Sequence, residues 1–255
     1  MSKFMDRLII GIILVLALLI ITFTNKLVLF FALLFVSTVA VYEMSNVLKK
    51  LKYSINLILA YIVNFFIVLF SYLDRSDLVL LTLSFSIMIS MALCIFIKGY
   101  KMKNQFALAF VSIYISLFFS FLVRLSNKEL FIWVFILSWG TDTFAYISGM
   151  LFGRHKLTEI SPNKTIEGAI GGIIGSLILT LIYCKILNFN QLPKYIFFAI
   201  LAGVISQLGD ISASNIKRKA GIKDYGNILR SHGGILDRFD SVLFIAPLVY
   251  LFSVI

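Results

Sequence analysis

The chain has 255 residues, of which 60% are hydrophobic and 14% are charged, and its formal net charge is +11. This composition excludes a soluble globular domain and predicts an integral membrane protein. The positive charge does not indicate nucleic-acid binding, because the basic residues stand between long apolar runs, where they orient membrane helices.

Apolar runs divide the chain into candidate membrane helices. A helix needs about 17–25 apolar residues to cross the hydrocarbon core, and nine runs in the sequence approach or meet this length. They cover residues 8–23, 27–42, 55–73, 78–97, 106–123, 130–150, 169–187, 195–213 and 239–255. The pattern predicts an all-α polytopic membrane protein with about nine transmembrane helices.

The first two runs are expected to act as a pair. Only Thr24, Asn25 and Lys26 separate them, which predicts a tight helical hairpin with the Lys26 ammonium at the membrane interface. The first run resembles a signal peptide, but it lacks a small-residue cleavage site and leads directly into the second, so we expect it to be retained. No internal repeat interrupts the pattern, and residues 1–255 are expected to form a single transmembrane domain.

Basic residues predict how the protein is oriented. Most of the 23 Lys and Arg residues lie in the N-terminal tail and in the loops after the second, fourth, sixth and eighth runs. Since basic loops remain on the cytoplasmic side, the N-terminus and these loops are expected to be cytoplasmic. Nine spans then place Ile255 on the external side.

Charged residues inside apolar runs indicate that function resides in the C-terminal half. Residues 1–128 are expected to be mainly scaffold, whereas residues 129–255 carry several carboxylates in or beside their runs. An ionisable side chain in a membrane helix is unfavourable unless it faces water, a partner or a metal, so Asp142 and Asp210 are functional candidates. Glu43, at the end of the second run, is expected to be an interfacial residue.

The eighth run has a polar face. Its polar residues recur every four positions or follow one turn later, so they fall on one side of a helix. They are Ser206, Asp210, Ser214, Lys217 and Arg218. A hydrogen-bonded seam between helices would explain this face. A site for Mg²⁺ is favoured, because Asp237 is also near in sequence and hard cations prefer oxygen ligands.

The segment 214–241 carries the densest group of polar residues. It combines basic side chains able to bind a polyphosphate with acidic side chains able to hold its metal ions. These residues are Lys217, Arg218, Lys223, Asp224, His232, Asp237 and Asp240. Between them, Gly233 and Gly234 lack Cβ atoms, so this turn can adopt positive φ and present N–H groups to an anion.

Two further segments carry charge. WGTDTFAY at 139–146 contains Asp142, and SPNKTIEG at 161–168 contains Lys164 and Glu167. The second segment also reads as a helix start, with Thr165 as the N-cap and Glu167 complementing the helix dipole. After it, Gly168, Gly171, Gly172 and Gly175 have the spacing of residues that allow close helix packing.

Together, the three segments resemble in sequence and in order the signature of the phosphatidate cytidylyltransferase family, also called CDP-diglyceride synthases. The resemblance covers about the last half of the chain and departs at Arg230, where the family usually has Pro or Gly. It implies transfer of a cytidylyl group from CTP to phosphatidic acid, giving CDP-diacylglycerol and pyrophosphate. The implied active site lies at the cytoplasmic side of the C-terminal helices.

On this hypothesis each charged residue receives a role. Asp210, Ser214 and Asp237 are expected to bind Mg²⁺, with Asp240 and Asp142 in support, and a second cation is left open. Lys217, Arg218 and Lys223 are expected to hold the triphosphate, and the expected catalytic residues are Asp210, Asp237, Lys217 and Arg218. The remaining substrate-binding candidates are Asp142, Asp224, His232, Gly233 and Gly234, with Asp224 and His232 positioning the nucleotide, and Lys164 for the lipid phosphate.

The expected partners are CTP, phosphatidic acid and membrane lipids, with no nucleic acid, and a homodimer is left open. The expected location is a bacterial inner membrane. Two other functions remain. A polyprenol or phytol kinase would also use CTP and a lipid but would transfer the γ-phosphoryl group. A cation transporter could place Asp142 and Asp210 along an ion path, although it leaves the basic loop with its glycine pair unexplained.

Overall fold

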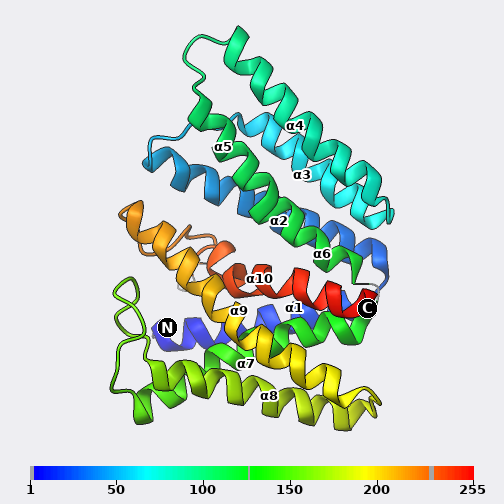
Figure 1. Ribbon diagram of the computed structural model, residues 1–255, viewed down its shortest axis with the longest axis vertical. Coiled ribbons are helices and arrows are strands. Elements are labelled where there is room, and N and C mark those ends of the chain that lie inside the picture. Colours follow the sequence, from blue (N-terminus) through cyan, green and yellow to red (C-terminus); the bar gives the residue numbers. More distant parts are fainter. Residues whose placement is uncertain (1–2, 126, 230–232) are drawn as a thin grey trace. The chain divides into compact units, whose positions relative to one another are not determined.

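The computed structural model describes residues 3–125, 127–229 and 233–255, with side chains described from residue 11 onward. Apart from an isolated bridge between Lys156 and Thr165, the regular structure of these residues is helical, which confirms the all-α prediction. The elements, labelled in Figure 1, are α1 (Lys3–Phe23), α2 (Lys26–Lys50), α3 (Leu57–Tyr72), α4 (Ser76–Phe96), α5 (Met102–Val111), the π-helix η1 (Ser112–Leu117), α6 (Phe118–Arg124), α7 (Lys128–Phe152), α8 (Ile166–Leu187), α9 (Leu192–Lys219) and α10 (Leu236–Val254).

Each predicted apolar run coincides with a helix, and the fifth run coincides with the continuous stretch α5–η1–α6. Within the described residues, six helical stretches are long and apolar enough to cross a membrane. They are α2, α4, α5–α6, α7, α8 and α9. The protein is therefore a polytopic membrane protein, while the count of nine spans stays a prediction, since α3 has only 16 residues.

The chain forms two compact units. The first contains Met1–Ser126 and Lys219–Arg238, and the second contains Asn127–Arg218 and Phe239–Ile255. The division near residue 126 lies close to the boundary expected between the scaffold and the functional half. However, the middle of the segment 214–241 belongs to the first unit, so residues from both sequence halves build that unit. That residues 1–255 form a single transmembrane domain stays a prediction.

The helix boundaries follow from capping residues. Asn25, Asn56, Asn127 and Thr165 each precede a helix and accept a hydrogen bond from one of its first backbone N–H groups. Such a cap satisfies a donor that has no partner within the helix. The Thr165 cap was predicted and is confirmed. Asn188 ends α8 in the left-handed conformation, with φ of 54°, which asparagine tolerates better than most residues.

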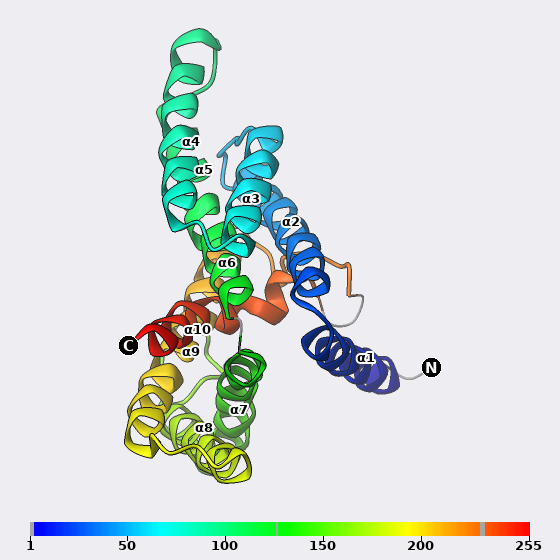
Figure 2. The same cartoon turned by 90° about the vertical axis from the view of Figure 1, so that its right-hand side faces the viewer.

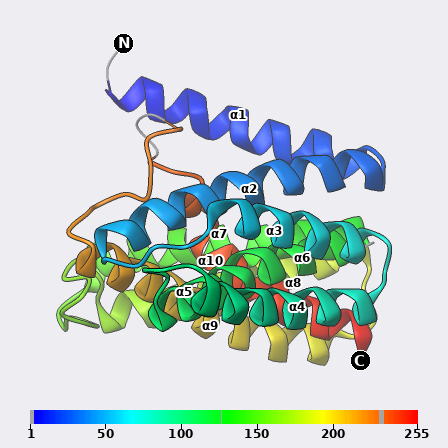
Figure 3. The ribbon, with the colours of Figure 1, turned by 90° about the horizontal axis from the view of Figure 1, so that it is seen from above.

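In the first unit, α3 packs against α2 and against α4 (Figures 2 and 3). The buried Asn64 amide of α3 donates to the hydroxyls of Ser37 and Thr38 on α2, at 3.0 and 3.2 Å. At the other end of α2, the chain reverses between α1 and α2 as predicted, and Lys26 pairs with Asp74 at 2.8 Å. These contacts join α2 to the rest of the first unit.

In the second unit, α7 and α8 lie side by side (Figures 1 and 2). The predicted packing role of the α8 glycines is confirmed, because a Cβ atom on Gly172 would lie 2.8 Å from the Thr141 carbonyl oxygen of α7. Trp133 is fully buried and donates from Nε1 to Thr180 of α8 at 3.0 Å. Its ring also contacts Tyr195 of α9 and Phe252 of α10. Four helices therefore share one core.

Replacing Gly172 should test this close approach. Gly172→Leu is expected to lower the free energy of unfolding by about 1–3 kcal/mol, because the new side chain must push against backbone rather than against a flexible side chain. Gly172→Ala should have a smaller effect in the same direction. Thermal unfolding of the purified protein in detergent measures both, with Ile170→Leu on the exposed side of α8 as the control. Equal stability of Gly172→Leu and the unchanged protein would contradict the packing.

Candidate functional site

The predicted polar face of the eighth run lies on α9, which extends to Lys219 and therefore includes both basic residues in the helix. Ser214 Oγ donates to Asp210 Oδ1 across one turn, at 3.4 Å. Lys217 is buried to 8% relative exposure, whereas Arg218 is exposed. A buried ammonium requires compensating charge, so the surroundings of Lys217 are central to the site.

A second cation reaches this face from the loop between α7 and α8. Lys164 Nζ forms an ion pair with Asp210 Oδ2, and both side chains are about a quarter exposed. Sequence reasoning assigned these two residues to different ligands and gave no reason to expect contact. The structure brings together two residues that are 46 positions apart in the chain.

Hydrogen bonds of the backbone and of the Glu167 side chain hold the loop that carries Lys164. The Leu157 N–H donates to the Lys164 carbonyl oxygen at 2.8 Å, and the Lys164 N–H donates to Ser161 at 3.0 Å. Glu167, in the first turn of α8, accepts from the backbone N–H groups of Arg154 and His155 and contacts the His155 ring. Glu167 thus stabilises the loop as well as complementing the helix dipole.

Asp240, in α10, completes a charged group in the second unit. Its Oδ1 accepts from the Ser241 N–H at 2.9 Å. Asp142 of α7, together with Asp210 and Lys217 of α9, lies close enough to Asp240 to interact with it electrostatically. Four of the predicted residues, from three helices, therefore form one charged group, which Lys164 joins through Asp210.

The glycine turn before α10 belongs to the first unit. Asp237 Oδ2 accepts from the backbone N–H groups of Tyr225 and Gly234, both at 2.8 Å. Gly233 has a φ of 77°, as its sequence context predicted, and a Cβ there would lie 2.8 Å from Asp237 Oδ2. In this structure the Gly234 N–H does bind an anion, but that anion is a carboxylate of the chain itself.

Glu43 of α2 reaches the same turn, while its expected position at the membrane interface stays a prediction. The residue is only 2% exposed. Its carboxylate accepts from the N–H groups of Ile235 and Leu236, at 3.0 and 2.8 Å. The signal that could have found it was present, because a carboxylate in an apolar run is a functional candidate by the same rule that selected Asp142 and Asp210.

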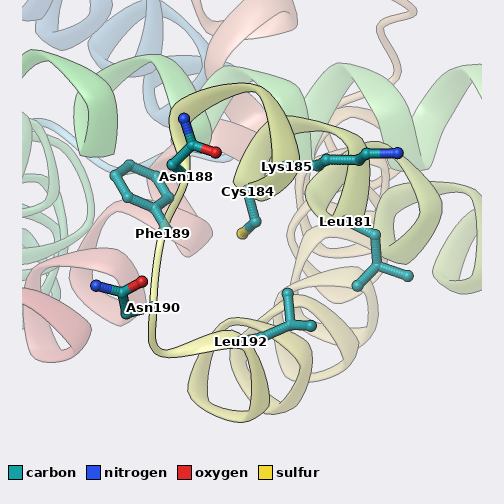
Figure 4. Close-up of a pocket in the computed structure, with 7 residues that line it drawn as sticks. All are labelled: Leu181, Cys184, Lys185, Asn188, Phe189, Asn190 and Leu192. Atoms are coloured by element: carbon teal, nitrogen blue, oxygen red, sulfur yellow. The ribbon is translucent and has the colours of Figure 1, made fainter.

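The other predicted residues belong to the segment between α9 and α10. Lys223 and Asp224 are exposed in the segment between α9 and α10. His232 and Arg230 lie outside the described residues. A pocket of about 460 Å³ lies between the end of α8 and the start of α9 (Figure 4), and none of the predicted site residues lines it. Its lining residues are Leu181, Cys184, Lys185, Asn188, Phe189, Asn190 and Leu192.

Asp210 and Ser214 supply oxygen atoms, the type of ligand that hard cations such as Mg²⁺ prefer. Among the described residues, no three His, Cys, Asp or Glu side chains are grouped to hold a metal ion. Mg²⁺ does not require such a cage, since it keeps several waters and is held by one or two carboxylates together with substrate phosphates. Asp210 and Ser214, whose oxygens already lie side by side, provide oxygen ligands of this kind.

These features define a class: a polytopic α-helical membrane protein in which carboxylates and ammonium groups from several helices form a charged group. Within that class the family is shown by comparison. The model of the Cytidylyltransferase family matches residues 5–255, and this chain belongs to that family.

Curated relatives bear a more specific name. Proteins named phosphatidate cytidylyltransferase are 44% identical to this chain over 157 residues in Staphylococcus saprophyticus subsp. saprophyticus and 40% identical over 164 residues in Bacillus subtilis (strain 168). Another, from Staphylococcus aureus (strain COL), is 41% identical over 157 residues. Each match covers 58% of this chain and 60% of the relative. The match thus spans about three-fifths of the length of these relatives.

Proposed function

We propose that this protein is a phosphatidate cytidylyltransferase, which converts CTP and phosphatidic acid to CDP-diacylglycerol and pyrophosphate. The observation that carries the proposal is the Lys164–Asp210 pair on the polar face of α9. It brings a cation suited to a lipid phosphate beside a carboxylate suited to a metal-bound nucleotide. The family match over residues 5–255 and the names of the relatives support the same reaction.

The proposed chemistry demands little from acid–base residues. A phosphate oxygen of phosphatidic acid attacks the α-phosphorus of CTP, the bond to the β-phosphate oxygen breaks, and pyrophosphate leaves. The attacking oxygen is already ionised near neutral pH, because the second pKa of a phosphate monoester is about 6. The protein therefore has to position two polyanions and neutralise their charge.

Each charged residue has a place in this scheme. Asp210 and Ser214 are proposed to hold Mg²⁺, and Asp237 is proposed as a further ligand, with Asp142 and Asp240 in support. When bound, the ion would neutralise charge on the nucleotide phosphates. Lys217, Arg218 and Lys223 would bind the triphosphate, and Lys164 would bind the lipid phosphate. Asp224 and His232 are proposed to position the nucleotide.

Product analysis tests the reaction. The purified protein would be incubated with phosphatidic acid and with CTP labelled at either the α- or the γ-phosphate. A cytidylyltransferase moves the α-label into the lipid product and the γ-label into pyrophosphate, whereas a lipid kinase moves the γ-label into the lipid. Reactions without phosphatidic acid serve as the control. Transfer of the γ-label to lipid would reject the proposal. Absence of labelled lipid with folded protein would also reject it.

We also infer that the loop between α9 and α10 faces the cytoplasm and that Ile255 is external, because most basic residues fall on one side of the predicted spans. Cysteine labelling checks this in intact cells. In a chain with Cys94 and Cys184 replaced, Lys219→Cys should resist a probe that cannot cross membranes and react after permeabilisation. A cysteine added after Ile255 should react in both conditions. Labelling of Lys219→Cys in intact cells would mean that the loop is external and would contradict the proposed orientation.

A further inference from the structure

Glu43 lies against the turn that precedes α10, although the two are almost 200 residues apart in sequence. Its two carboxylate oxygens bind different N–H groups, Oε1 that of Ile235 and Oε2 that of Leu236. The first N–H groups of a helix have no partner within the helix, and such donors are commonly satisfied by a side chain just before the helix. Here the carboxylate comes from α2.

Glycines of the turn fit closely around this carboxylate. A Cβ atom on Gly226 or on Gly234 would lie 2.5 Å from Glu43 Oε1, which is much closer than atoms can approach. Gly226 does not have positive φ, so backbone conformation does not explain the glycine at that position. The absence of a side chain at both positions leaves room for Glu43.

The same turn holds Asp237. The Gly234 N–H donates to Asp237 Oδ2, while the next two N–H groups along the chain donate to Glu43. Three successive backbone donors are thus divided between two carboxylates. Glu43 thus holds the backbone of Ile235 and Leu236, directly before Asp237. The Asp237 side chain is hydrogen-bonded to the same turn, at the Gly234 N–H.

We propose that Glu43 is a positioning residue for the reaction, which caps α10 from α2 and thereby sets the place of the glycine turn and of Asp237. The proposal rests on the proposed function of this protein. Glu43 does not contact substrate in this scheme and acts through the backbone of residues 234–236. The N-terminal helices would then contribute to catalysis as well as to the scaffold.

Glu43→Gln is the main test, because glutamine keeps the size of the side chain but has only one accepting oxygen, and its amide group faces the second N–H. The variant should lower kcat about tenfold, as loss of a residue that orients a ligating group typically does, while the apparent KM values for both substrates change less than about twofold. Asn64→Ala, which removes buried hydrogen bonds to α2 away from the turn, should leave kcat within about twofold of the unchanged protein.

A measurement without substrate separates this role from general destabilisation. Hydrogen–deuterium exchange in detergent should become faster in peptides covering residues 233–239 of Glu43→Gln, with no change in peptides from α3 and α4. Asn64→Ala should not accelerate exchange in the turn. Unchanged exchange at residues 233–239 or unchanged kcat in Glu43→Gln would overturn the proposal. If the unchanged protein makes no CDP-diacylglycerol, the proposed function fails, and the exchange result still decides whether Glu43 holds the turn.

A double-mutant cycle with Gly226 tests the contact itself. Gly226→Ala should accelerate exchange in the turn and lower kcat, because its methyl group displaces the Glu43 carboxylate. Once Glu43 is replaced by alanine, the methyl group has room, so the double variant should be no worse than Glu43→Ala alone. Neighbouring residues that share a contact show such non-additivity. Fully additive losses would mean that the two residues act independently and would overturn the proposal.

Discussion

Asp237→Asn is expected to lower kcat about 10³-fold, equivalent to about 4 kcal/mol of transition-state stabilisation, while the protein remains folded. The structure gives the reason for this separation of effects. Asp237 Oδ2 accepts two backbone N–H groups, and the single carbonyl oxygen of asparagine can accept both in its place. The substitution therefore keeps the turn and removes the negative charge that we propose for Mg²⁺ binding.

Steady-state kinetics over a range of Mg²⁺ concentrations measures this effect, with thermal unfolding to verify the fold. Asp77→Asn, an exposed carboxylate paired with Arg75, is the matched control and should retain full activity. Asp240→Asn should have a milder effect than Asp237→Asn if Asp240 only supports the site. Near-normal turnover of Asp237→Asn at ordinary Mg²⁺ would remove Asp237 from the metal ligands, and equal losses at both positions would contradict their ranking.

Lys164→Ala is expected to lower kcat/KM for phosphatidic acid about 10²-fold, with a change of less than about twofold in the apparent KM for CTP. Truncating one partner of a buried, hydrogen-bonded charge pair costs about 2–5 kcal/mol of binding, and we expect a value at the low end of this range for Lys164, which is a quarter exposed. Lys164 pairs with Asp210 in this structure, so we propose that the ammonium moves between this carboxylate and the lipid phosphate when the substrate binds.

Kinetics in detergent micelles, with lipid given as surface concentration, distinguishes the two substrates. Lys156→Ala is the matched control, since Lys156 is an exposed lysine of the same loop. Lys164→Arg should recover part of the loss, because it retains the positive charge. An effect on CTP dependence alone would assign the loop to the nucleotide. Equal effects on the kinetics of both substrates would mean that Lys164 acts mainly by positioning the Asp210 carboxylate.

The sequence predicted the helices well because hydrophobic periodicity and capping are local properties. All nine apolar runs correspond to helices, and the N-cap at Thr165 was identified from a motif of a few residues. The predicted runs differ from the observed helices at their ends. The helix α2 continues past the predicted end at residue 42 to Lys50, and α9 continues past residue 213 to Lys219, because polar residues can extend a helix beyond its apolar run.

For the site, the residue types and spacings determined that Asp210, Ser214 and Lys217 share one face of a helix, since a single helix fixes that relation. The same spacing could not reveal that Lys164 meets Asp210, because the path of the loop between α7 and α8 depends on its tertiary hydrogen bonds.

From the order of residues alone, the chain is a membrane protein whose carboxylates are concentrated in the C-terminal half. The folded chain was needed to reveal that Glu43, from the half expected to be scaffold, caps the helix that carries Asp237. A contact between residues almost 200 positions apart leaves no local pattern, and glycines that make room for a carboxylate look in sequence like glycines that make a turn. Burial of Glu43 distinguishes the two cases, because a carboxylate removed from water must find donors, and the N–H groups of Ile235 and Leu236 supply two.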